Sequence, residues 1–176
     1  MINAPGNIRQ LGFIVRDLDE AVAQWLAHSS AGPFVVMRGQ RFDGWTYLGE
    51  PQDQILDIAF AQAGPMMIEL IEAQGPWPNV YGDAPPTETC VLHHFGLLVA
   101  DIEAASAALN APLVTTAQID ATSQLRYFDC RERFGVRLEL ISDTPSVQAF
   151  FTLSESLARS WDGTSAPVRR FEEVTG

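Results

Sequence analysis

The chain contains an internal repeat, and this repeat limits its fold more than any other feature. Residues 10–21 read QLGFIVRDLDEA, and residues 94–105 read HFGLLVADIEAA. Aligned without gaps, the two segments share a glycine, a valine, an aspartate and an alanine. A second pair of segments, MIELI and LELIS, each places one glutamate (Glu69 and Glu139) inside an apolar strand. The sequence therefore predicts two copies of one half-domain.

The first copy is predicted to be one strand, one helix and three further strands. Alternating side chains in residues 8–15 predict a strand, and apolar residues at helical spacing follow it. Asp17 or Asp19 offers an N-cap for that helix. The expected elements are a strand at 8–15, a helix at 19–28, and strands around 34–37, 55–62 and 66–71.

The second copy repeats this order after residues 74–90, whose four prolines and two glycines predict a linker. Its helix is expected to begin at Asp101 or Glu103. The expected elements are a strand at 92–99, a helix through residue 109, and strands near 113–116, 123–130 and 136–141. We therefore divide the chain into a first domain, 1–142, with module one at 7–73, the linker at 74–90 and module two at 91–142, and a C-terminal helix and tail at 143–176.

The C-terminal segment is expected to be a helix followed by a polar, extended tail. Thr144 and Pro145 are typical of a helix start, and an apolar stripe follows them as far as Trp161. This stripe favours packing against the body or across a dimer interface. The alternative is a lid over a functional site.

Composition excludes several function classes. The 176 residues carry a formal net charge of −11, which disfavours nucleic acid and anionic membranes as partners. All eleven basic residues are arginine, and the absence of lysine excludes Schiff-base chemistry. Residues 1–7 do not resemble a signal peptide, and no apolar run approaches the roughly 18 residues of a membrane span. We expect a cytoplasmic protein with Cys90 and Cys130 reduced.

Four polar residues lie at equivalent points of the repeat, namely Gln10, Glu69, His94 and Glu139. A glutamate in an alternating strand can simply face solvent, whereas a buried carboxylate costs several kcal/mol unless it is paired or binds a metal. Their recurrence favours one shared site. Imidazole, amide oxygen and two carboxylates suit a divalent ion such as Zn²⁺, Ni²⁺, Co²⁺, Mn²⁺ or Fe²⁺.

The residues beside these four suggest further roles. Gly12 and Gly96 each follow a candidate ligand by two positions and leave space, either for a substrate or for a neighbouring strand. His93 is expected to point to the face opposite His94 and to be structural.

Four residues are candidates for substrate binding. Met67 flanks Glu69 on its face, and Tyr127 lies on a neighbouring strand whose inward face the sequence leaves open. Arg137 flanks Glu139 and could hold a substrate carboxylate or pair with Glu139 or Asp129. Trp45 lies in a loop where module one carries its extra residues.

The paired modules, the openings QxGxxVxD and HxGxxVxD, and the strand-embedded glutamates resemble the vicinal oxygen chelate superfamily over residues 7–142. This superfamily includes glyoxalase I, methylmalonyl-CoA epimerase, extradiol dioxygenases and bleomycin resistance proteins. The resemblance implies an α+β fold of two tandem βαβββ modules that form a cup-shaped mixed sheet around a metal site. It also implies the metal ligands Gln10, Glu69, His94 and Glu139, a set similar to that of eukaryotic-type glyoxalase I.

The resemblance further implies a metal-dependent isomerase, epimerase or lyase that acts on a small oxygenated molecule. Glu139 is the first candidate for a ligand that also exchanges protons, and Glu69 is its partner. One alternative is a metal-free binding protein of the resistance type. Another is an extradiol dioxygenase, although Gln10 stands where its second histidine would be required. Many members dimerise, and we expect a homodimer.

Overall fold

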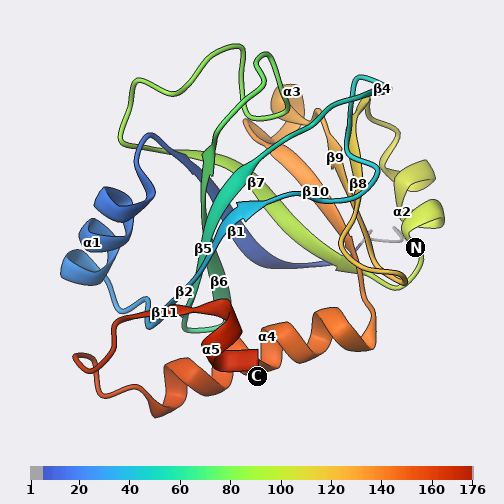
Figure 1. Ribbon diagram of the computed structural model, residues 1–176. Helices are drawn as coiled ribbons and strands as arrows, with labels where there is room; N and C mark the ends of the chain where they lie inside the picture. The colour runs from blue at the N-terminus through green and yellow to red at the C-terminus, as the bar shows by residue number, and fades with distance from the viewer. Residues whose placement is uncertain (1–5, 176) are drawn as a thin grey trace.

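A computed structural model describes residues 6–175. One curved sheet runs through both halves of this part of the chain (Figure 1). Its strands lie in the order β11 (Val168–Arg170), β2 (Phe34–Gln40), β5 (Leu56–Ala63), β6 (Met66–Ala73), β1 (Asn7–Val15), β7 (Cys90–Val99), β10 (Arg137–Ser142), β9 (Gln124–Phe128) and β8 (Leu113–Gln118). The β1–β7 pair therefore lies at the junction of the two halves.

The two halves have the same pairing scheme on either side of this junction. Strands β1 and β7 are antiparallel, β6 runs parallel to β1, and β10 runs parallel to β7. The next pairs outward, β6 with β5 and β10 with β9, are antiparallel. The structure thus confirms the predicted α+β class, with tandem βαβββ modules in a curved mixed sheet.

Helices α1 (Leu18–His28) and α2 (Ile102–Leu109) cover the outer face of the sheet (Figure 1). Each begins at an aspartate whose side chain caps it: Asp17 accepts a bond from the Glu20 amide and Asp101 one from the Ala104 amide, both 2.9 Å long. The outward-facing apolar side chains of each module pack against its own helix. This packing leaves the other sheet face, with Gln10 and Gly12, directed inward.

The inner face is filled partly by the long connections. The β2–β5 loop carries the hairpin of β3 (Thr46–Tyr47) and β4 (Glu50–Pro51), and it buries Trp45. The segment 74–90, predicted as a linker, also folds inward and buries Val80 and Tyr81 in the same cluster, and its last residue, Cys90, begins β7. A short helix, α3 (Arg131–Phe134), precedes β10.

The C-terminal segment lies across the sheet below the modules (Figure 1). Helix α4 (Pro145–Ser160), capped by Thr144, packs against β5. The predicted extended tail is only partly correct, because it forms β11, which pairs in parallel with edge strand β2, and helix α5 (Phe171–Thr175). No helix within residues 6–175 is long and apolar enough to cross a membrane.

Candidate metal centre

Two rows of side chains, each with members from both modules, cross the centre of the inner face. In the first row, Gly12 of β1 is paired with Glu69 of β6 on one side and His94 of β7 on the other. Cross-strand neighbours point to the same face, so Glu69 and His94 flank the glycine. The glycine leaves room for the two side chains to approach each other.

The second row is the counterpart of the first. Gly96 of β7 is paired with Gln10 of β1 and with Glu139 of β10. A glycine thus again separates two of the four repeated polar residues. The duplicated sequence therefore places all four side chains on adjacent rows of one sheet face.

The space at these glycines is taken by the site itself. A Cβ atom at Gly12 would lie 1.8 Å from His94 Cε1, and one at Gly96 would lie 2.7 Å from Gln10 Oε1. The room that a substrate could have used is therefore filled by candidate ligands. Both glycines permit the close approach of a side chain from the partner strand.

Three of the four side chains converge on one point. His94 Nε2 lies 3.1 Å from Glu69 Oε2 and 3.2 Å from Glu139 Oε2. One donor atom from each of the three residues lies within 4.8 Å of the others. His94 is fully buried, and Glu69 and Glu139 are 7% and 4% exposed. Such a group of acceptors is suited to hold a cation.

The hydrogen bonding of these residues is incomplete. Gln10 Oε1, Glu69 Oε2 and His94 Nε2 are buried and have no hydrogen-bond partner among the described residues. Although His94 Nε2 is close to Glu69 Oε2, the two groups are not aligned as a hydrogen bond. Buried polar atoms are normally paired, and unpaired ones that converge indicate a missing partner. Their lone pairs fit a metal ion.

The electrostatics require a positive charge at this centre. Burial is the main cause that raises the pKa of Glu69. Burial acts to lower the pKa of His94, but the carboxylates of Glu139 and Glu69 outweigh it and raise that pKa to about 9. A proton on His94 supplies the charge between the two buried carboxylates in the free protein, and a bound metal ion would take the place of that proton.

His93 corrects the sequence interpretation, because it contacts His94 rather than pointing to the opposite face. The pairing of β1 with β7 shifts between Gly12–His94 and Phe13–Leu92, so His93 is the extra residue of a β-bulge. Its Nδ1 lies 3.0 Å from His94 Nδ1, and its Nε2 lies 2.9 Å from the Val80 carbonyl oxygen.

This contact assigns the ring protons from the hydrogen-bond network. A carbonyl only accepts, so the 2.9 Å contact with Val80, which is shorter than the 3.3 Å contact with Arg137 Nη1, favours a proton on His93 Nε2, and its Nδ1 then accepts one from His94 Nδ1. The remaining nitrogen of His94, Nε2, faces Glu69 and Glu139, and it would present a lone pair there once a cation replaces its proton. Burial lowers the pKa of His93 well below its usual value, which agrees with a neutral ring. No local signal in the sequence indicates this role.

A cavity of about 390 Å³ adjoins the cluster. Gln10, Glu69 and Glu139 line it, so donor groups of the site are open to a bound molecule. The rest of the wall is mainly apolar and includes the fully buried Met67. Pockets of this kind, apolar with a few converging polar groups, are typical of small-molecule sites.

The structure places the other three substrate-binding candidates outside the described lining of this cavity. Tyr127 is buried and packs edge-on against His94, with ring centroids 5.1 Å apart. Trp45 lies in the cluster that fills the other part of the inner face. Arg137 is half-buried, with Nη1 3.3 Å from His93 Nε2. Their contact with a substrate stays a prediction.

Fold and site together define a class of protein: a duplicated βαβββ sheet with a buried Glu–His–Glu group at its centre. The family model described as Glyoxalase/Bleomycin resistance protein/Dioxygenase superfamily matches residues 9–128. The chain belongs to this superfamily, which confirms the predicted vicinal oxygen chelate resemblance. A search of curated proteins gives no match.

Solved structures with the same fold include methylmalonyl-CoA epimerases. The enzyme from Mycobacterium tuberculosis is 16% identical, with a TM-score of 0.56, and the match covers 85% of this chain and 96% of that one. An epimerase in complex with methylmalonyl-CoA and NH₄⁺ is 15% identical, with a TM-score of 0.51 and coverage of 80% and 96%. At these identities the likeness shows the fold alone.

Proposed function

We propose that Gln10, Glu69, His94 and Glu139 hold one divalent metal ion. The supporting observation is the convergence of buried, unpaired lone pairs on a point between two carboxylates. An imidazole nitrogen with three oxygen donors suits Zn²⁺, Ni²⁺, Co²⁺, Mn²⁺ or Fe²⁺.

We further propose that the protein is a glyoxalase-like isomerase, epimerase or lyase that moves a proton next to a carbonyl group. The observation that carries this proposal is that both Glu69 and Glu139 border the cavity as well as the cluster. When bound, the metal would supply Lewis-acid polarisation of the substrate carbonyl. The chain's own carboxylates then act on the adjacent carbon.

Glu139 is the proposed base, and Glu69 is its partner. One carboxylate would take a proton from the carbon next to the carbonyl on one face of the substrate. The other carboxylate, on the opposite face, would return a proton to that carbon or to a neighbouring atom. General base catalysis of this kind contributes roughly 10²–10⁴-fold. The apolar cavity wall limits the water that could compete for the proton.

Proton exchange in D₂O tests this function. Chelator-treated protein would be reloaded with each of the five metals and incubated with 2-oxo acids, hemithioacetals and acyl thioesters. Exchange at the carbon next to the carbonyl, followed by NMR, should need the metal and should fall by roughly 10²-fold or more in Glu139→Gln. Glu103→Gln, which alters an exposed ion pair with Arg126, is the control. Exchange that is equal in Glu139→Gln and the wild type contradicts the proposal.

We also propose a homodimer, because many members of the superfamily dimerise. Sedimentation of the purified chain would test it independently of activity. A single species at the mass of one chain, 19.3 kDa, contradicts a dimer.

A further inference from the structure

One wall of the cavity is aromatic. Phe60 of β5 meets Phe150 of α4 in an edge-to-face contact with centroids 4.9 Å apart, and Phe171 of α5 lies 6.0 Å from Phe150. All three line the cavity together with Glu69 and Glu139, and Phe60 is the cross-strand partner of Glu69. The cavity therefore has a polar wall and an aromatic wall that adjoin each other.

The aromatic wall is fixed to the body of the protein. Arg9 of β1 pairs with Glu155 of α4 at 2.8 Å and lies over the Phe151 ring at 5.3 Å from its centroid. Strand β11 joins the sheet beside β2 and leads directly into α5. The C-terminal segment is thus held against the sheet and forms part of the cavity wall.

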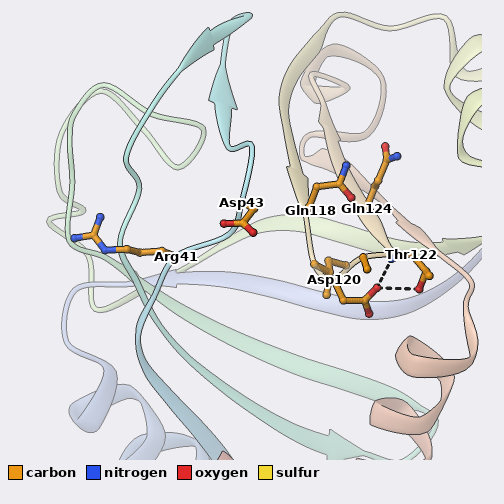
Figure 2. A pocket seen from close by; sticks show the side chains of 8 residues that line it. Arg41, Asp43, Gln118, Asp120, Thr122 and Gln124 are labelled. Carbon is orange, nitrogen blue, oxygen red and sulfur yellow. Dashed lines mark hydrogen bonds between the residues drawn. The ribbon is translucent and has the colours of Figure 1, made fainter.

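The rim of the cavity is acidic. A second hollow, of about 560 Å³, adjoins it and shares Arg41, Ile119 and Asp120 with its lining. Figure 2 shows Asp43 and Asp120 at this hollow, while the side chain of Arg41 points away from Asp120. Arg41 instead forms an ion pair with Asp53.

The charge of this rim disfavours polyanions. Hydrogen bonds, the strongest from Ser146, hold the pKa of Asp120 below its usual range, so its carboxylate is charged near neutral pH. Among the described residues that line the two hollows, Arg41 is the one basic side chain. Phosphate groups are normally recognised by several cationic or backbone N–H donors.

We infer that this site, if it works as proposed above, takes an aromatic carbonyl compound without phosphate groups. Its oxygens face Glu69 and Glu139, and its ring packs among Phe60, Phe150 and Phe171. The inference rests on the proposed function for the role of the two carboxylates, whereas the aromatic wall is a feature of the cavity itself. It separates this chain from the structural neighbour that is bound to methylmalonyl-CoA.

Three probes test the inference by calorimetry: phenylpyruvate, pyruvate, and propionyl-CoA. Burial of a phenyl ring should make phenylpyruvate bind about 10–100-fold more tightly than pyruvate. Phe150→Ala and Phe171→Ala should each reduce this preference several-fold, while Phe134→Ala, at an exposed residue of α3, should leave it unchanged. Equal binding of the two acids, tighter binding of propionyl-CoA, or no binding of phenylpyruvate overturns the inference.

Measurement with metal-loaded and chelator-treated protein separates the two proposals. If the protein prefers phenylpyruvate but binds no metal, the proposed function is contradicted and the inference of an aromatic ligand is supported. Metal binding and proton exchange without preference for the ring would contradict the aromatic ligand alone. Metal affinity should be the same in Phe150→Ala and the wild type.

Discussion

Gly12 lies directly opposite His94 across the β1–β7 pair, and the imidazole ring occupies the place of the missing side chain. The counterpart relationship holds between Gly96 and Gln10. The repeat thus conserves a geometry within one chain: each module's glycine accommodates a polar side chain of the other module. The two modules are therefore joined at the site as well as along the sheet.

Gly12→Ala should displace the His94 ring. The added Cβ would lie 1.8–2.3 Å from three ring atoms, and overpacking of a well-filled interior costs typically 1–3 kcal/mol. We expect a loss of that size in the free energy of unfolding by urea, together with at least roughly tenfold weaker metal binding.

The control for this substitution is Gly39→Ala. Gly39 has φ +62° and open space around it, so an alanine there strains the backbone by about 1 kcal/mol without contacting the site. It should lower stability and leave metal affinity unchanged. Wild-type metal affinity in Gly12→Ala would contradict the account of the glycine.

His93→Phe should weaken metal binding by roughly 10–100-fold, because partners that orient a ligand histidine have effects of this size. Phenylalanine keeps the ring but removes the acceptor for His94 Nδ1. The glutamine variant should restore part of the affinity, since an amide offers both an acceptor and a donor. Nitrogen-15 NMR of metal-free protein above pH 9, where the His94 ring is neutral, provides an independent measurement: His94 should show a proton on Nδ1 in the wild type and a mixture of tautomers in His93→Phe. Unchanged tautomers would contradict the positioning role.

Glu69→Gln and Glu139→Gln should each weaken metal binding by roughly 100-fold or more, since each removes a charged donor from the cluster. Neither variant should unfold the protein, because the amide is isosteric and the like-charge repulsion between the two carboxylates is reduced. Titration with Co²⁺, followed by visible absorption, would measure the affinity. Glu155→Gln, which alters a partly exposed ion pair with Arg9, should behave as the wild type. Normal affinity in both site variants would contradict the metal centre.

Asp17→Ala and Asp101→Ala should destabilise the protein equally, by about 1 kcal/mol each. Each carboxylate caps the first helix of its module with a 2.9 Å bond to a backbone amide. Asparagine at either position should retain most of the stability. Urea unfolding checks this, and Asp19→Ala, which removes an exposed ion pair with Arg38 but no cap, should cost less than either cap variant. If only one of the two alanine variants loses stability, the equivalence of the two helices is contradicted.

The repeat made the fold predictable. Apolar and polar residues alternate along its strands and recur at helical spacing in its helices, so the local sequence shows which face of an element each side chain occupies. The convergence of Glu69, His94 and Glu139, with Gln10 on the same sheet face, could be predicted for the same reason: equivalent positions in paired modules lie on adjacent rows. Asp17 and Asp101 are the caps, whereas the sequence left Asp19 and Glu103 as alternatives.

Features that depend on distant parts of the chain could not be predicted. His93 points toward His94 because of a register shift between β1 and β7, which no local pattern encodes. Val80 and Tyr81 are buried although their segment is rich in proline and glycine, because the inner face must be filled. Strand β11 has three residues, too few to show a period, and forms because edge strand β2 offers it hydrogen bonds.

The most direct test of the metal centre is a crystal structure of protein loaded with Zn²⁺ or Ni²⁺, with the ion located by anomalous scattering. We expect one strong peak per chain, at about 2.0–2.2 Å from His94 Nε2 and from oxygens of Gln10, Glu69 and Glu139. A peak bound elsewhere, or none between these side chains under saturating metal, would contradict this expectation.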